Sequence, residues 1–255
     1  MERRYFLKLC AVAAADFLLA TSDLLMPRQA AAENSYSYRY ENGGLVYTFD
    51  ITNSLLVTCI ESEHGSDLDG FRYRIREDYV KPKIARPLLA VTGGFSSENG
   101  RESVGAIVRD GELITAGCSP HEYTSVVFQR KLWRRDFYFG GINASYGNNF
   151  CMRRGGYARL LPFSKDIWER DIRPPDVANR IAIGTRPVNG RKKIIVHAGP
   201  MDVLDAAKFM EGYGCTEAVL GDGGSKYARF SWIDDSEPQH PESPIKDVIV
   251  IMERL

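Results

Sequence analysis

The stretch from Asn179 to Ser225 constrains the fold of this chain most strongly, because apolar segments alternate in it with turn residues. Two apolar, β-branched segments, 179–184 and 193–197, are separated by a polar segment that ends in Asn189-Gly190. Asn-Gly between two such segments is typical of the tight turn of a β-hairpin. The pattern therefore predicts two antiparallel strands.

A helix, a strand and a glycine loop are expected to follow this hairpin. Apolar residues recur at helical spacing within 203–210, and Asp202 just before them is a typical N-cap. The apolar segment 215–220 predicts a buried strand, which would carry the loop 221–225 to the edge of the sheet. The backbone of a glycine loop can approach a ligand closely, and Asp222 places a carboxylate there.

Further strands are predicted from apolar or alternating segments along the rest of the chain. These segments are 35–40, 45–51, 54–60, 71–76, 87–91, 105–114 (a hairpin), 123–128, 136–139 and 247–252. The polar segments 61–70 and 147–155 are predicted to be loops. Nothing resembles a linker or a repeat, so we expect one domain of the α+β class, with a mixed, largely antiparallel β-sheet flanked by helices.

Residues 1–32 have the features of an export signal peptide. The pair Arg3-Arg4 resembles the twin-arginine motif, an apolar segment follows, and three alanines precede Glu33 as a cleavage site. An ordinary secretory signal is the alternative, and either route exports the protein to the periplasm or the extracellular space. Asp16 and Asp23 within the apolar segment disfavour a membrane span, because a charge at the bilayer centre costs about 2.5–3.5 kcal/mol.

Charge and cysteine content narrow the function classes. The chain has 33 basic and 33 acidic residues, and this balance gives no electrostatic reason to expect a nucleic-acid or membrane-surface partner. Four cysteines follow the signal segment, Cys59, Cys118, Cys151 and Cys215, which suits disulfides in an oxidising compartment and leaves three pairings open. No C-x-x-C spacing occurs, and we predict neither a metal nor a cofactor.

Five segments in the same order resemble the phosphodiester glycosidase domain family. They are 90–95 with Gly93-Gly94, the hairpin 108–113, the strand 179–184, the helix and Gly-Cys pair within 204–215, and the segment 218–225 with Asp222-Gly223-Gly224. The resemblance implies N-terminal strands over 33–84 and a phosphodiester glycosidase-like domain over 85–255. Four positions depart from the family pattern: Thr92 and Leu220 replace asparagines, Gly221 replaces leucine, and Lys226 replaces serine.

The same resemblance implies an exported hydrolase that cleaves a sugar-1-phosphodiester or a related glycoconjugate at the anomeric bond. This chemistry needs a group that holds the phosphate and acid or base groups around an oxocarbenium-like transition state. We expect Arg180 to clamp the phosphate and Asp222 to act as acid or base or to contact a sugar hydroxyl. Expected substrate-binding residues are Gly93, Gly94, Gly223, Gly224, Ser225, Lys226 and His197.

Each of these residues also has a structural alternative. Arg180 would then be an ion-pair partner, Asp222 a turn former and His197 a capping histidine. An alternative function is a non-catalytic cell-envelope protein that binds a glycan through a divergent form of the same site. A nucleotide-binding loop is disfavoured, because the glycines of 221–225 match neither G-x-G-x-x-G nor the Walker pattern.

Overall fold

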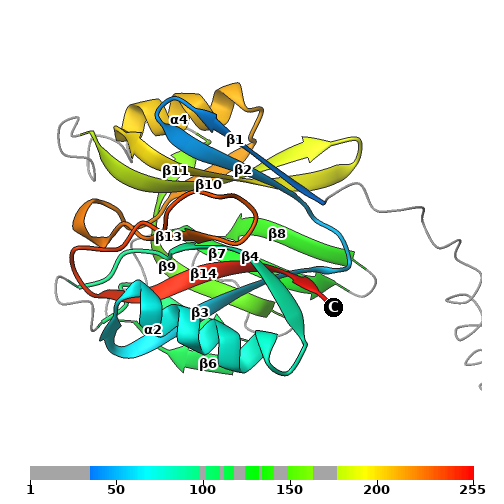
Figure 1. The fold of residues 1–255 in the computed structure, drawn as a ribbon. Helices are drawn as coiled ribbons and strands as arrows, with labels where there is room; N and C mark the ends of the chain where they lie inside the picture. Colours follow the sequence, from blue (N-terminus) through cyan, green and yellow to red (C-terminus); the bar gives the residue numbers. More distant parts are fainter. Residues whose placement is uncertain are drawn as a thin grey trace, which may run out of the picture. The chain divides into compact units, whose positions relative to one another are not determined.

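The computed structural model describes residues 35–97, 102–109, 112–117, 124–131, 134–140, 149–162 and 177–255. The chain from Tyr36 to Leu255 forms one compact unit, in which two sheets face each other (Figure 1). Helix α4 (Val203–Gly212) lies on the outer face of one sheet, and α2 (Leu68–Ile75) lies beside the other. The α+β class is therefore confirmed, and none of the described helices is long and apolar enough to cross a membrane.

Among the described residues, the larger sheet has ten strands. Eight follow the order β1 (Tyr36–Glu41), β2 (Gly44–Asp50), β11 (Arg191–Met201), β10 (Ala178–Val188), β12 (Glu217–Leu220), β9 (Asn149–Leu161), β5 (Ala106–Arg109) and β6 (Glu112–Thr115). The other two, β7 (Thr124–Lys131) and β8 (Arg134–Gly140), pair with each other, and β7 also pairs with β9. Every strand pairing within the described residues is antiparallel.

The smaller sheet, as far as the structure describes the chain, has four strands and contains the C-terminal strand. Its order is β13 (Arg229–Ser231), β4 (Ala85–Thr92), β14 (Ile245–Arg254) and β3 (Leu55–Ser66). The closing strand predicted at 247–252 is confirmed as β14, which lies between β4 and β3. The N-terminal strands contribute to both sheets, because β2 pairs with β11 and β3 pairs with β14.

The hairpin predicted from Asn189-Gly190 is confirmed and is longer than its apolar segments. Strands β10 and β11 pair from Ala178↔Met201 to Val188↔Arg191. Asn189 has φ 48° and Gly190 has φ 75°. Two central residues with positive φ define a type I′ turn, whose twist matches that of the paired strands.

The predicted helix is α4, and Asp202 caps it as expected. The Asp202 carboxylate accepts a hydrogen bond from the Asp205 backbone N–H at 2.7 Å, which satisfies one of the unpaired donors of the first turn. Ala206, Ala207 and Met210 are buried against the sheet. After the helix, Cys215 leads into β12, which pairs with β10 and β9 in the middle of the larger sheet.

The strand predicted at 71–76 is wrong, because this segment belongs to helix α2 and the turn of π-helix that follows it. Asp67 caps α2 by accepting a hydrogen bond from the Gly70 N–H at 2.9 Å. Leu68, Phe71 and Ile75 are buried. Their spacing of three and four residues is that of a helix, so the cap and the helical face override the local alternation of arginines with apolar residues.

Two predicted loops are also wrong. The segment 61–70 is divided between the end of β3 and α2, and the segment 147–155 contains the first half of β9. Strand β9 pairs with β5, β7 and β12, so its backbone donors and acceptors are used by three neighbours. A polar sequence can form a central strand when neighbouring strands satisfy its backbone in this way.

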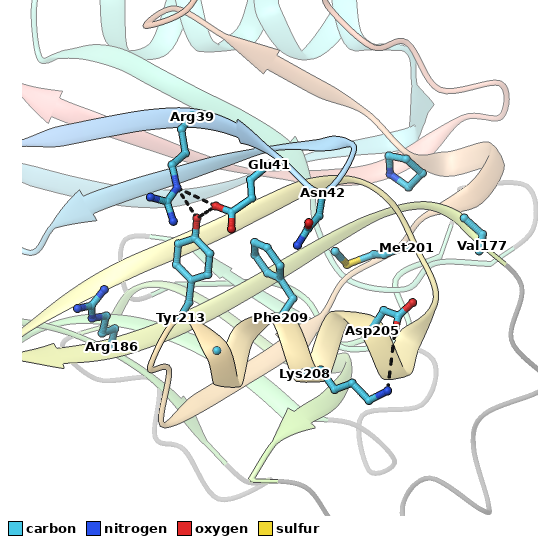
Figure 2. A pocket seen from close by; sticks show the side chains of 12 residues that line it. Arg39, Glu41, Asn42, Val177, Arg186, Met201, Asp205, Lys208, Phe209 and Tyr213 are labelled. Atoms are coloured by element: carbon cyan, nitrogen blue, oxygen red, sulfur yellow. Dashed lines mark hydrogen bonds and ion pairs between the residues drawn. The ribbon is translucent and has the colours of Figure 1, made fainter.

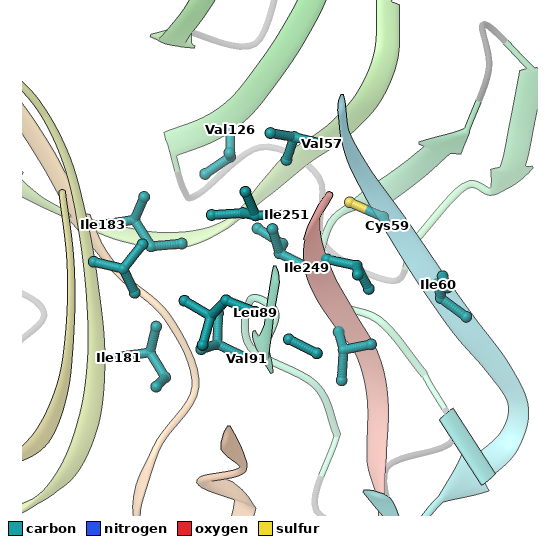
Figure 3. Close-up of a cluster of buried hydrophobic side chains, with 14 of the residues drawn as sticks. Val57, Cys59, Ile60, Leu89, Val91, Val126, Ile181, Ile183, Ile249 and Ile251 are labelled. Atoms are coloured by element: carbon teal, nitrogen blue, oxygen red, sulfur yellow. The ribbon is translucent and has the colours of Figure 1, made fainter. Parts of the chain in front are cut away.

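The main hydrophobic core lies between the two sheets (Figure 3). Ile181 and Ile183 of β10 face Leu89 and Val91 of β4, and Ile249 of β14 extends the same layer. A second apolar cluster lies between α4 and the outer face of the larger sheet. Its members include Val46, Leu160, Ala182, Ile195, Met201, Ala206, Ala207, Met210, Cys215 and Leu220.

The expectation of disulfides is not met by the two cysteines whose side chains are described. Cys59 and Cys215 are buried thiols. Cys59 belongs to the core between the sheets and Cys215 to the cluster under α4, so the larger sheet separates them. Cys118 and the side chain of Cys151 lie outside the described part of the chain.

Candidate functional site

The loops that follow β4 and β12 meet, although one belongs to each sheet. The Asp222 N–H donates to the carbonyl of Gly93 at 3.0 Å, and the Gly221 N–H donates to the carbonyl of Ile181 at 2.8 Å. Because β4 and β12 end at the same side of the core, their glycine segments lie in direct contact. The structure thus brings together two segments that the sequence indicated separately.

The carboxylate of Asp222 is held by donors from both loops. One oxygen, Oδ2, accepts hydrogen bonds from the Ser96 N–H and the Ser96 hydroxyl, each at 3.2 Å. The other, Oδ1, accepts from the Gly223 N–H at 3.0 Å. An ionised carboxylate is an acceptor of this kind, with two oxygens that receive several donors. The side chain of Asp222 is 13% exposed, so it retains a small accessible surface.

Lys226 contacts both Ser96 and Asp222. Its Nζ is 3.9 Å from Asp222 Oδ2 and donates to the carbonyl of Ser96 at 2.9 Å. It also donates to the carbonyl of Ser97. The side chain is only 11% exposed, and it therefore fastens the segment 93–97 to Asp222 rather than extending into solvent. We refer to Gly93, Ser96, Asp222, Gly223 and Lys226 as the Asp222 cluster.

Three glycines in or next to the Asp222 cluster cannot be replaced by a larger residue, because other atoms lie too close to them. A Cβ on Gly221 would lie 2.7 Å from the carbonyl oxygen of Gly93, and a Cβ on Gly223 would lie 2.6 Å from that of Asn179. A Cβ on Gly93 would overlap the carboxylate of Asp247. These positions exclude any side chain, because real Cβ atoms do not approach other heavy atoms so closely.

The remaining predicted loop residues differ in accessibility. Gly94 is buried two residues after the end of β4, whereas Gly224 and Ser225 are exposed in the 3₁₀ turn η2 (Gly224–Lys226). Gly224 has φ 60°, a conformation that glycine adopts without strain. Gly224 and Ser225 therefore present the accessible edge of the cluster.

Arg180 lies beside the Asp222 cluster, at the start of β10. A Cβ on Gly223 would be 3.3 Å from the Arg180 Cα and 3.4 Å from its Cγ. The Nε of Arg180 donates to the carbonyl of Met201 at 3.1 Å. Arg180 is thus bound to the end of β11 and lies beside Gly223, the residue that follows Asp222 in the chain.

His197 is not part of this cluster. Its side chain has no exposed surface, and its ring lies against Phe209 of α4 with the ring centroids 4.8 Å apart. A Cβ on Gly44 would lie 2.5 Å from His197 Nε2, so the imidazole fills the space that this glycine leaves. Burial lowers the pKa of His197 to about 4, which the charge and backbone of Glu41 offset only in part. We therefore do not retain His197 as a substrate-binding residue.

A buried polar layer under the cluster was missed by the sequence analysis. Asp247 of β14 is 1% exposed and lies opposite Glu61 of β3 in the register of the two strands. Its carboxylate lies against Gly93, and the Gly93 N–H donates to the backbone carbonyl of Asp247 at 3.0 Å. Glu61 Oε2 is 3.5 Å from Arg109 Nη1, and Glu61 Oε1 is 3.7 Å from Arg74 Nη2. A single aspartate in the apolar strand 245–252 was the available signal, because buried acids are rare unless they are paired.

The described residues contain no group of three or more histidine, cysteine or acidic side chains that could hold a metal ion. They do contain a groove of about 660 Å³ between α4 and β1, shown in Figure 2. Its lining includes Arg39, Glu41 and Tyr213 but no member of the Asp222 cluster. The groove is connected to that cluster through Met201, which lines it and accepts the hydrogen bond from Arg180.

Comparisons with known proteins support the fold. No protein-family model matches the sequence, and a search of curated proteins finds no match either. Among solved structures, the zebrafish N-acetylglucosamine-1-phosphodiester α-N-acetylglucosaminidase catalytic domain, auto-inhibited by its pro-peptide, aligns with a TM-score of 0.61 and 14% identity. The alignment covers 89% of this chain and 86% of that one.

A second structure, from Burkholderia pseudomallei K96243, carries the provisional description of an exported protein. It aligns with a TM-score of 0.55 and 10% identity, over 82% of this chain and 74% of that one. At these identities the comparisons establish a shared fold. This chain therefore shares its fold with the zebrafish catalytic domain.

Proposed function

We propose that this protein is an exported hydrolase that cleaves a sugar-1-phosphodiester or a related glycoconjugate at the anomeric bond. The observation that carries the proposal is the contact of Arg180 with the glycine loop of Asp222, at the point where the loops of both sheets meet. The shared fold with a catalytic domain of this activity supports it. Export is part of the proposal and is supported by the signal-like sequence of residues 1–32.

The two charged residues have complementary roles in this proposal. The Arg180 guanidinium binds the phosphate, for which a planar, permanently charged donor is well suited. Asp222 contacts a sugar hydroxyl or exchanges a proton at the anomeric centre, through its remaining accessible surface. Gly224 and Ser225 supply backbone N–H groups at the exposed edge of the loop. Asp247 receives no catalytic role, because it is buried under Gly93 and supports the loop from below.

The test is hydrolysis of an N-acetylglucosamine-1-phosphodiester and a panel of other sugar phosphodiesters by the mature chain. Asp222→Asn and Arg180→Ala are expected to abolish turnover while the protein stays folded. Matched controls are Asp235→Asn and Arg191→Ala, which change exposed residues outside the cluster and are expected to leave turnover unchanged. Unaltered turnover in Asp222→Asn would remove Asp222 from the mechanism, and no turnover by the folded wild type on the whole panel would overturn the proposal.

A glycan-binding protein without activity is the second candidate, and one observation favours it. Lys226 stands where the resembled family has serine, and its ammonium group is directed at Asp222 and at two carbonyl groups. Asp222 therefore stabilises the segment 93–97 through its contacts with Ser96 and Lys226, which is a structural role rather than a catalytic one. The Asp222→Asn variant distinguishes the two candidate functions. In an enzyme it abolishes turnover and preserves binding, whereas a binding protein shows no turnover in the wild type either.

A further inference from the structure

The groove between α4 and β1 has the size and composition of a ligand site. Its volume of about 660 Å³ lies within the range of roughly 300–1,000 Å³ that is typical of ligand pockets. Figure 2 shows Phe209 and Tyr213 rising from α4 toward Arg39 and Glu41 of β1. The wall of the groove thus combines aromatic rings with charged groups.

Phe209 and Tyr213 form an aromatic platform one helical turn apart. Their ring centroids are 4.7 Å apart and the rings are tilted by 32°. His197 packs under Phe209 and fixes its position from below. Two neighbouring rings held in this way offer an apolar surface on which the carbon face of a sugar can pack.

The groove is basic at the Tyr213 end. Arg39 and Glu41 bind each other at 2.8 Å, and the Arg39 guanidinium also lies 4.9 Å from the centroid of the Tyr213 ring. Arg186 lines the same end and has neither a hydrogen bond nor an ion pair with any described residue. Lys208 is 4.0 Å from Asp205 along the helix. Glu41 is paired with Arg39, and Asp205 lies near Lys208. The positive charge of Arg186 is therefore available to a ligand.

The opposite end of the groove is connected to Arg180, which lies beside the Asp222 cluster. Met201 and Val177 line this end, and the Met201 carbonyl accepts the hydrogen bond from Arg180. Arg180 and Arg186 lie on the same strand, six residues apart, which corresponds to a separation of about 20 Å. A ligand that contacts both is therefore an extended chain rather than a single sugar.

We propose that this groove binds an acidic oligosaccharide, with a carboxylate or phosphate of the chain on Arg186 and sugar rings on Phe209 and Tyr213. The inference rests on the proposed function in one respect, because it makes the groove the continuation of the Asp222 site toward the rest of a glycan. It assigns the substrate class as an anionic glycan chain. Arg186 is then a specificity-determining residue.

The test is calorimetric binding of a galacturonic acid trimer and of the uncharged galactose trimer to the mature protein. The acidic trimer is expected to bind at least tenfold more tightly, and Arg186→Gln to remove that preference without weakening the neutral trimer. Raising the ionic strength to about 1 M, where the screening length is about 3 Å, should reduce the preference in the same way. Arg191→Gln changes an exposed arginine that lies next to the turn of the same hairpin and does not line the groove, so this matched control should bind as the wild type.

Equal binding of both trimers, no binding of the acidic trimer, or an Arg186→Gln variant that binds like the wild type would overturn the inference. Its failure is distinguishable from that of the proposed function, because binding of the trimers is measured without turnover. If turnover is found and Arg186→Gln leaves KM for an acidic substrate unchanged, the hydrolase assignment stands and the groove assignment falls. If no turnover is found but binding of the acidic trimer depends on Arg186, the groove assignment stands and the hydrolase assignment falls.

Discussion

The backbone N–H of Asp222 donates to the carbonyl of Gly93, and this hydrogen bond connects the ends of the two sheets directly through the backbone at the candidate site. The contact requires a glycine at position 221, because a Cβ there would lie 2.7 Å from the Gly93 carbonyl oxygen. The buried carboxylate of Asp247 occupies the space under Gly93 that a side chain would take. The geometry of the loop therefore depends on residues that carry no catalytic chemistry.

Replacing Gly93 by alanine should destabilise the protein. The new methyl group would overlap the Asp247 carboxylate, and overpacking of this kind costs roughly 1–3 kcal/mol. Urea unfolding followed by circular dichroism measures the change. Gly212→Ala is the control, since nothing lies within 4 Å of its added Cβ at the end of α4, and it should be neutral or slightly stabilising. Equal stability of the two variants would contradict the contact at Gly93.

Lys226 and Asp222 should be energetically coupled. Both side chains are largely buried and share Ser96, so Lys226→Met and Asp222→Asn are expected to show a coupling energy of roughly 0.5–3 kcal/mol in a double-mutant cycle. Unfolding free energies of the two single variants and the double variant give this value. The exposed pair Lys208 and Asp205, 4.0 Å apart, serves as the control cycle, with a coupling below about 0.5 kcal/mol. Coupling near zero at Lys226 would mean that it does not hold Asp222.

A buried ionic cluster around Arg229 should make the protein sensitive to acid. Arg229 Nη1 donates to the Tyr47 hydroxyl at 2.8 Å and lies 3.8 Å from Asp234 Oδ1, which connects β2, β13 and the loop after it. Burial by itself raises the pKa of Asp234, but hydrogen bonds from Ser231, Ser236 and Tyr47 outweigh it and hold the pKa below its ordinary value.

A carboxyl group whose pKa is lowered on folding stabilises the protein above its unfolded pKa of about 3.9 and loses that effect as the pH falls through the folded value. The unfolding free energy of the wild type should therefore decrease below about pH 4. Asp234→Asn should be less stable at neutral pH, because Arg229 loses its buried partner, and its stability should depend less on pH in the acid range. Parallel acid profiles for the two proteins would refute this assignment.

His197 should titrate far below the pKa of an imidazole in an unfolded chain. Its pKa of about 4 compares with about 6.5 in an unfolded chain, so the unfolded state binds the proton more readily between these values. The contribution of His197 to stability is complete above about pH 6.5 and decreases as the pH falls toward 4. Proton NMR of the imidazole C–H resonances should show one histidine with a midpoint near pH 4, which His197→Asn removes and His240→Asn does not. Midpoints above pH 6 for every histidine would contradict the burial of His197.

The sequence predicted elements well where local chemistry decides the backbone. Asn189-Gly190 fixes its hairpin because both residues tolerate positive φ, and Asp202 fixes the start of α4 because its carboxylate satisfies a free N–H group. The sequence-based prediction failed where contacts between distant segments determine the backbone structure. The segment 147–155 reads as a polar loop, but its residues 149–155 form the first half of β9, because β5 and β7 supply partners for the backbone there.

By itself the sequence determined the glycine loop with Asp222, the strand that carries Arg180, and the α+β class. Only the tertiary structure decided which of these residues meet. It placed Arg180 beside Gly223, excluded His197 by burying it under Phe209, and revealed Asp247 beneath Gly93. The physical reason is that turns and caps are satisfied within a few residues. The position of a strand in a sheet, and with it the neighbours of its side chains, depends instead on pairing between distant segments, which local sequence does not encode.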